Sequence, residues 1–142
     1  MDDRPVTPLW YHPTLGLLAG GLLASAETRN LAVFLSALLV YAVGSAVLVS
    51  SYRKLAGTWV SGAPRGRAGR ISVVLMLALY AVAGLAAVLD LGLGLRGTFV
   101  LAGVAAFALV VVLGRRFDAA LRAQILREEA PAAAPPATTR PA

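Results

Sequence analysis

The side chains most able to do chemistry are few in this 142-residue chain, and their spacing forms no known catalytic or metal-binding pattern. Cysteine is absent, which excludes disulfides, thiolate metal ligands and cysteine nucleophiles. The single histidine, His12, lies between Tyr11 and Pro13, without a carboxylate cluster nearby in the sequence. We therefore expect His12 to be a polar residue at a membrane interface, and we predict no metal site and no cofactor.

Motifs for phosphate and dinucleotide binding are also missing. Lys54 is the only lysine, and its neighbours do not match the Gly-x-x-x-x-Gly-Lys-Ser/Thr loop. The Gly-Leu-Gly turn at 92–94 lacks a preceding strand and a third glycine in register. Glu128 and Glu129 are adjacent, so they point apart on a helix and make poor acid and base partners. The sequence therefore predicts that the protein is not an enzyme.

The composition indicates that hydrocarbon is the main solvent of this chain. Hydrophobic residues make up 58% and charged residues 14%, whereas a soluble domain carries about 25% charged residues. The charges also cluster in short segments, and long stretches between them have none. The long uncharged stretches are therefore the parts of the chain that we expect to cross a membrane, and the charged segments connect them.

Three uncharged segments are long enough for transmembrane helices. A bilayer core of about 30 Å needs about 20 apolar residues in a helix. We predict helices at about 31–51, 71–90 and 97–116, the last extended at its end by Arg115 and Arg116, whose long side chains reach the headgroups.

A fourth helix is predicted at about 9–27, ahead of the other three. This segment is short and rich in glycine, and Trp10 and Tyr11 would lie at the interface as aromatic anchors. The alternative is a cleaved signal peptide, because the small residues at 24–26 resemble a cleavage site. Asp2 and Asp3 argue against it, since signal peptides begin with net positive charge.

The segment after the last span predicts an amphipathic extension. Phe117, Leu121 and Ile125 repeat every four residues, which continues the helix to about residue 129. Residues 130–142 are dominated by proline and alanine and are predicted to be disordered. The predicted fold is thus all-α: a polytopic transmembrane bundle of four helices over residues 1–129, with a cytoplasmic amphipathic extension at its C-terminal end.

The distribution of basic residues predicts the orientation. If all four helices span, eleven of the 13 Lys and Arg residues lie on one side, and only Arg29 and Arg96 on the other. The positive-inside rule makes the rich side cytoplasmic, so both termini are predicted to lie in the cytoplasm of a plasma-membrane protein. Juxtamembrane basic residues also attract anionic headgroups. The candidates for this role are Arg53, Lys54, Arg65, Arg67, Arg70, Arg115 and Arg116.

The net charge of +6 does not by itself indicate a nucleic-acid partner. The Arg-Gly-Arg stretch at 65–67 resembles an RNA-binding segment, but it occurs once and without a folded nucleic-acid-binding module. We therefore predict no nucleic-acid partner.

Small and hydroxylated residues mark the candidate helix-packing faces. Helices in lipid associate through close approach and interhelical hydrogen bonds, and small residues four apart permit that approach. A mid-membrane hydroxyl also needs a partner, because an unsatisfied one in hydrocarbon is costly. The packing candidates are Gly16, Gly20, Ala24, Tyr41, Ser45, Tyr80, Ala102 and Ala106.

Two stretches resemble a known group of proteins. The Trp-Tyr-His-Pro sequence at 10–13 is followed by Leu-Gly-Leu-Leu at 15–18, and Tyr-Arg-Lys at 52–54 is followed by Gly-Thr-Trp-Val-Ser-Gly at 57–62. Together they resemble small, uncharacterised integral membrane proteins of high-GC Gram-positive, actinobacterial-type bacteria. The resemblance implies a membrane location and brings no activity or functional residue with it.

Two functions fit these observations. The first is a non-enzymatic helical bundle that assembles with itself or with another membrane protein, because of its small-residue faces and its amphipathic extension. The alternative is a small permease, pore or lipid-handling protein, with a holin-like permeabilising protein as a variant. No ionisable residue lies deep in the predicted spans, which argues against a proton- or ion-coupled pump.

Overall fold

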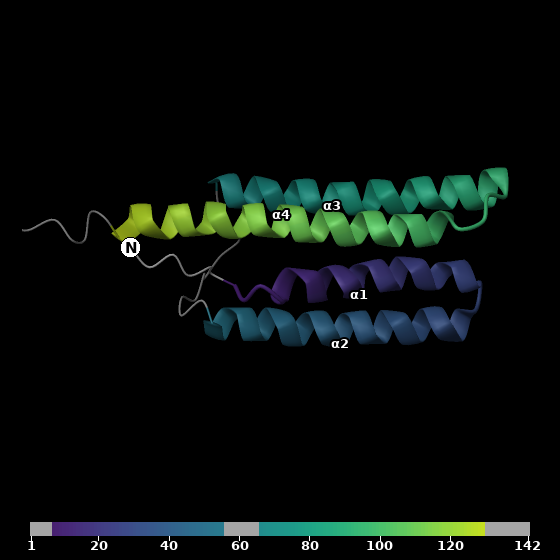
Figure 1. The fold of residues 1–142 in the computed structure, drawn as a ribbon, viewed down its shortest axis with the longest axis horizontal. Helices are drawn as coiled ribbons and strands as arrows, with labels where there is room; N and C mark the ends of the chain where they lie inside the picture. Colours follow the sequence, from purple (N-terminus) through teal and green to yellow (C-terminus); the bar gives the residue numbers. More distant parts are fainter. Residues whose placement is uncertain (1–6, 56–65, 130–142) are drawn as a thin grey trace, which may run out of the picture.

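The computed structural model describes residues 7–55 and 66–129, and these form helices without a strand. The α-helices are α1 (Tyr11–Ser25), α2 (Leu31–Leu55), α3 (Gly66–Ala87) and α4 (Thr98–Glu129) (Figure 1). A 3₁₀ turn, η1 (Ala26–Thr28), follows α1, and a π-helical turn, η2 (Val88–Gly92), follows α3. The predicted all-α class with four helices is confirmed. Arg65, the 130–142 tail and the side chains of Arg53 and Lys54 lie outside the described residues.

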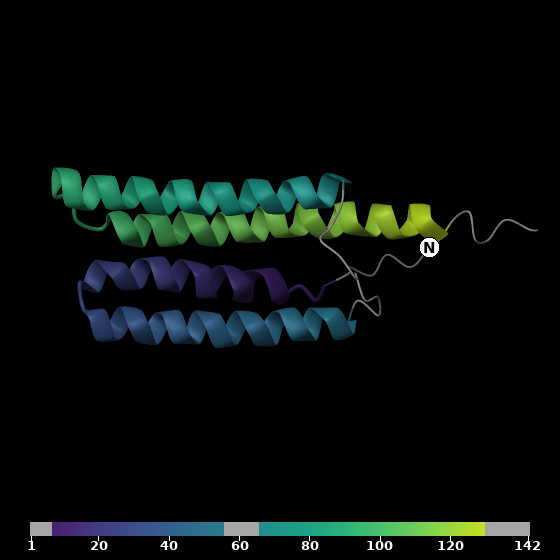
Figure 2. The same ribbon diagram turned by 180° about the vertical axis from the view of Figure 1, so that it is seen from behind.

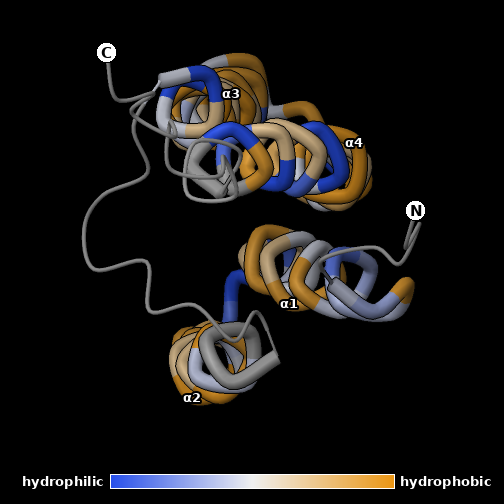
Figure 3. Tube along the Cα trace, turned by 90° about the vertical axis from the view of Figure 1, so that its left-hand side faces the viewer, coloured by the Kyte–Doolittle hydropathy of each residue, from blue (hydrophilic) through white to orange (hydrophobic). Residues whose placement is uncertain are grey.

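The four helices form an open row in the order α3, α4, α1, α2, rather than a closed bundle. Figures 1 and 2 show this order from two opposite sides, and Figure 3 shows it from the end. Helix α1 packs mainly against α4, α4 also packs against α3, and α2 packs against α1. Helices α2 and α3 therefore lie at the two ends of the row. The C-terminal turns of α4 project beyond the other helices (Figure 1).

The break between α1 and α2 is set by two adjacent residues. Arg29 adopts a left-handed backbone conformation with φ of 52°, which ends the 3₁₀ turn. The Asn30 Oδ1 then accepts hydrogen bonds from the backbone N–H groups of Ala32 at 3.0 Å and Val33 at 3.4 Å. This is the N-cap arrangement, which satisfies donors that a helix start leaves free. The tight turn makes α1 and α2 neighbours that run in opposite directions.

Most large apolar side chains lie on the outside of the row, whereas the inside holds alanines and only a few large side chains. Figure 3 shows the hydrophobic colour on the outward surfaces of α2 and α3. Helices in lipid approach closely through small residues and leave the large apolar ones to the hydrocarbon. Among the described residues, the buried apolar side chains are Tyr11, Leu48, Ala68, Ala86, Ala102, Ala106, Val110 and Leu121.

Three described helices are long and apolar enough to cross a membrane, judged by length and composition. These candidate spans are Leu31–Ser51, Gly66–Gly92 and Thr98–Gln124. In the first two spans only 6% of the most apolar stretch is buried inside the protein, whereas in the third span 33% is buried. Helix α4 is therefore the central helix of the three. The 15-residue α1 falls below the length of a candidate span. The chain is a helical membrane protein with at least these three candidate crossings.

Glycines bring α1 and α4 into direct backbone contact. A Cβ atom at Gly20 would lie 2.5 Å from the carbonyl oxygen of Gly103, and one at Gly16 would lie 3.1 Å from that of Phe107. A Cβ at Gly103 would in turn lie 3.3 Å from the Cβ of Ala24. Any side chain at Gly20 would force the helices apart. This close approach forms the centre of the fold.

Candidate functional site: a buried polar cluster between α1 and α4

Three polar side chains meet where the start of α1 lies against α4. The His12 Nε2 lies 2.7 Å from the Asp118 Oδ2. The Thr7 hydroxyl donates a hydrogen bond to the same oxygen and lies 3.3 Å from His12 Nε2. The exposed fractions are 3% for Thr7, 7% for His12 and 9% for Asp118, so the cluster is shielded from solvent. We call these three residues the polar cluster.

Gly114 makes room for the histidine ring of the polar cluster. It precedes Asp118 by about one turn of α4, and a Cβ at this position would lie 2.8 Å from Cε1 and 2.9 Å from Cγ of His12. Those distances are shorter than real contacts, so only glycine lets the ring lie this close to the α4 backbone. The ring then reaches Asp118 one turn further along the same face. Gly114 of α4 thus determines where the His12 side chain of α1 can lie.

The Asp118 carboxylate is satisfied at one oxygen only. Its Oδ2 accepts from Thr7 and lies against His12, whereas Oδ1 is buried and has no hydrogen-bond partner among the described residues. A buried carboxylate that lost its partners would cost several kcal/mol, on the order of 3–5. The cluster therefore fixes how α1 and α4 are paired at this end.

The geometry of the polar cluster differs from that of a nucleophilic triad. In such a triad the carboxylate binds one nitrogen of the imidazole and orients the ring, while the opposite nitrogen takes the proton of the hydroxyl. Here Thr7 and Asp118 both approach His12 Nε2. Nor do the described residues bring three His, Asp or Glu side chains together, as a catalytic zinc site requires. The arrangement suits helix pairing better than group transfer.

Two cavities lie on either side of the polar cluster. One of about 550 Å³ is lined by Thr7, His12 and Asp118 together with Arg115 and Arg122. The other, of about 220 Å³, lies between all four helices. Its lining residues are Tyr11, His12, Leu15, Val49, Ile71, Ser72, Leu75, Val110, Leu113, Gly114, Phe117 and Asp118. The polar cluster thus borders both cavities, of which only the first, called the cationic cavity below, is lined by arginines.

A second group of polar contacts joins the opposite end of α1 to α4. The Glu27 carboxylate accepts hydrogen bonds from the backbone N–H groups of Gly97 at 2.7 Å and Phe99 at 3.3 Å, and so caps the start of α4. Beside it, the Arg29 guanidinium donates to Asp90 in η2 at 2.9 Å. Asp90 is buried, with 5% of its surface exposed. Polar contacts therefore hold α1 at both ends.

The predicted packing residues fall into two groups. Gly16 and Gly20 of α1 are buried against α4. Ala102 and Ala106, which belong to α4, are buried as well, and Ala24 of α1 lies next to Gly103. The hydroxylated candidates do not join them: the Ser45 hydroxyl donates to the Ala42 carbonyl of its own helix, and Tyr41 is half-buried. Tyr80 lies on the outside of α3, 72% exposed.

The predicted headgroup residues with described side chains are Arg67, Arg70, Arg115 and Arg116. All four are exposed, and they lie at the same end of the row as the polar cluster. They meet there because α1 and α3 begin at this end, where α4 passes on toward its C-terminus (Figure 1). Arg67 and Arg116 line one cleft, and Arg115 lines the cationic cavity beside the polar cluster.

The polar cluster is a feature that sequence reasoning missed. His12 is predicted to lie at the interface, without a carboxylate cluster near it in the sequence; in the structure it is buried against Asp118 of α4. The two residues are 106 positions apart, so no local pattern could pair them. The available signal was topological, because the predicted orientation places both residues on the same side of the membrane.

Comparison with known proteins identifies no relative of this chain: no family model matches it, and no curated protein or solved structure is significantly similar. The resemblance to small actinobacterial-type membrane proteins therefore rests only on the two stretches that suggested it.

Proposed function

We propose that this chain is a non-enzymatic, multi-pass plasma-membrane protein that works by associating with a further membrane helix, from a second copy or from another protein. In this proposal all four helices cross the bilayer and both termini lie in the cytoplasm. The observation that carries the proposed association is the outward face of α3, described below.

The contacts of α1 support a fourth crossing. Its 15 α-helical residues and the 3 residues of η1 span about 28 Å, close to the thickness of the hydrocarbon core. His12 contacts Asp118, just beyond the uncharged part of α4, and Glu27 contacts Gly97, immediately before α4 begins. A helix that follows the uncharged part of α4 along its whole length crosses whatever thickness that part crosses. The same contacts support retention of this segment over its removal as a signal peptide.

The outward face of α3 has the features of a helix-association surface. It consists of Leu77, Tyr80, Ala81 and Gly84 of α3 together with Val88 at the start of η2, which recur at helical spacing and are all exposed. Tyr80 lies near the middle of the Gly66–Gly92 span, where a hydroxyl facing hydrocarbon lacks hydrogen-bond partners. A Cβ at Gly84 would have no atom within 4 Å, so another helix can approach closely there.

Site-specific photo-crosslinking in native membranes tests this association. The probe is p-benzoylphenylalanine in place of Leu77, and the matched control places it at Leu39 on α2. The two leucines are 63% and 65% exposed, so they differ in the helix they occupy and hardly in accessibility. We expect protein adducts from position 77 and only lipid adducts from position 39. An adduct of twice the monomer mass identifies a second copy, and any other mass another protein.

Two results would reject the proposed association. One is equal capture from both positions, which would indicate random collision in the membrane. The other is lipid capture alone from position 77, which would make the outward face of α3 an ordinary lipid-facing surface.

A second candidate function, lipid handling or passive permeation, is favoured by the 220 Å³ cavity between the four helices. Its lining is mostly apolar, with His12 and Asp118 at its boundary. All of its lining residues come from the end of the row where α1 and α3 begin. That confinement suits the binding of an apolar chain better than passage across the membrane.

A further inference from the structure

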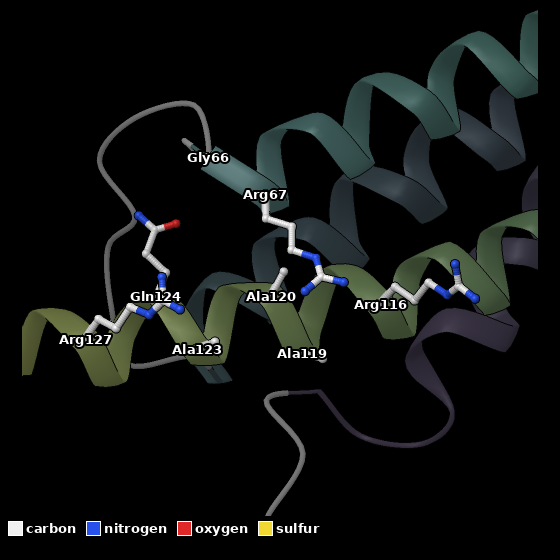
Figure 4. A pocket seen from close by; sticks show the side chains of 8 residues that line it. All are labelled: Gly66, Arg67, Arg116, Ala119, Ala120, Ala123, Gln124 and Arg127. Carbon is white, nitrogen blue, oxygen red and sulfur yellow. The ribbon is translucent and has the colours of Figure 1, made fainter.

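A second feature at this end of the row is a cleft between the first turn of α3 and the C-terminal part of α4. It measures about 740 Å³, within the range of small-molecule pockets. Arg67 extends from α3 across the gap toward α4, and Arg116, Gln124 and Arg127 come from α4 (Figure 4). The cleft exists because α4 presents only small side chains at its floor. The floor residues are Ala119, Ala120 and Ala123.

The charge of this arginine cleft has one sign. Its lining includes Arg67, Arg116 and Arg127 and no acidic residue. None of the three arginines forms an ion pair with a residue in the described parts of the chain. Guanidinium groups bind phosphate oxygens in a bidentate manner, which makes this lining suited to a phosphate group. Gly66, the first residue of α3, also lines the cleft, so the N-terminus of this helix faces it. The partial positive charge of a helix N-terminus attracts anions.

The position of the arginine cleft along the helices matches the headgroup layer. Ile71 begins the uncharged part of α3, so Arg67 lies about one turn outside it. Arg116 lies two residues beyond Gly114, where the uncharged part of α4 ends. Both guanidinium groups therefore lie just outside the apolar part of the candidate spans. This is where lipid phosphates lie.

We propose that the arginine cleft binds the phosphate of an anionic glycerophospholipid headgroup, with Arg67 on α3 and Arg116 on α4 as its two main ligands. The site joins two helices, so the bound lipid bridges the start of α3 and the extension of α4. This binding is independent of the association proposed above, because it uses the end of α3 and not its outward face.

The test is titration of the detergent-purified protein with phosphatidylglycerol, with bound lipid counted by native mass spectrometry. A guanidinium that binds the phosphate directly contributes a hydrogen bond to a charged group, which corresponds to about a tenfold change in affinity or more. We therefore expect Arg67→Gln and Arg116→Gln each to weaken binding at least about tenfold. The matched control is Arg115→Gln, which removes the same charge from the neighbouring residue, and that residue lines the cavity beside the polar cluster instead. It should weaken binding by no more than about fivefold, which is the effect of a juxtamembrane charge without a direct contact.

Two further ligands separate the sources of the phosphate. Phosphatidylcholine should bind more weakly than phosphatidylglycerol, since its choline group is repelled by the arginines. Soluble glycerol 3-phosphate should bind more weakly still, because it lacks the apolar chains that hold a lipid beside the spans. If Arg115→Gln weakens binding as much as Arg116→Gln does, only surface charge is involved and the proposed site is wrong. Equal binding of glycerol 3-phosphate would overturn the lipid as its ligand.

Discussion

Replacing Gly20 by alanine adds one methyl group at the closest approach of α1 and α4. That group would lie 2.5 Å from the Gly103 carbonyl oxygen, and 3.4 Å is the lower limit of ordinary contact. The helices must therefore separate by about 0.9 Å at this point, because a backbone oxygen cannot rotate away as a side chain can. A gap of that size forfeits a quarter to a half of the dispersion energy of each facing atom pair.

The neighbouring Gly21 provides a matched control for this substitution. A Cβ at Gly21 would have no atom within 4 Å. Both changes replace glycine by alanine inside α1, so both gain about 0.5–1 kcal/mol of helix stability. Only Gly20→Ala also incurs the overpacking cost, which is typically about 1–3 kcal/mol. We expect Gly20→Ala to be less stable than Gly21→Ala by about 1–3 kcal/mol, and Gly103→Ala to behave as Gly20→Ala does.

The free energy of unfolding can be measured by titrating sodium dodecyl sulfate into mixed micelles and following helical circular dichroism. The comparison between the two variants cancels the shared gain in helix propensity. If Gly20→Ala proves as stable as Gly21→Ala, the two helices do not approach closely at Gly103, and the packing described here is refuted.

Two further predictions follow from the polar cluster and the proposed topology. Asp118→Ala leaves buried His12 and Thr7 without their acceptor and should lower the free energy of unfolding by about 2–4 kcal/mol in the same titration. Asp118→Asn keeps an acceptor oxygen, so it should lower the free energy of unfolding by about half as much. If both variants were as stable as the wild type, the cluster would contribute nothing to stability. In intact cells a membrane-impermeant thiol reagent should label Gly92→Cys between α3 and α4 but should label Ala123→Cys only after lysis, and the reverse pattern would invert the orientation.

The sequence by itself determined the elements and their chemistry. An uncharged run of about 20 residues must become a helix in lipid, because every backbone N–H and C=O group has to be satisfied within the segment. The stretch of the chain that became α2 follows from this rule alone. The glycines at 16 and 20 also stood out from spacing, since close helix approach depends on the absence of a side chain.

Only the tertiary structure decided which helices meet and which polar groups they bury. The helices form an open row with Tyr80 facing outward, although Tyr80 is among the residues predicted to pack between helices. Helix order is set by the fit of helix surfaces across the interfaces, such as the backbone contact of Gly20 with Gly103. The pairing of His12 with Asp118 follows from that order. Such contacts join residues distant in the chain, so no local pattern encodes them.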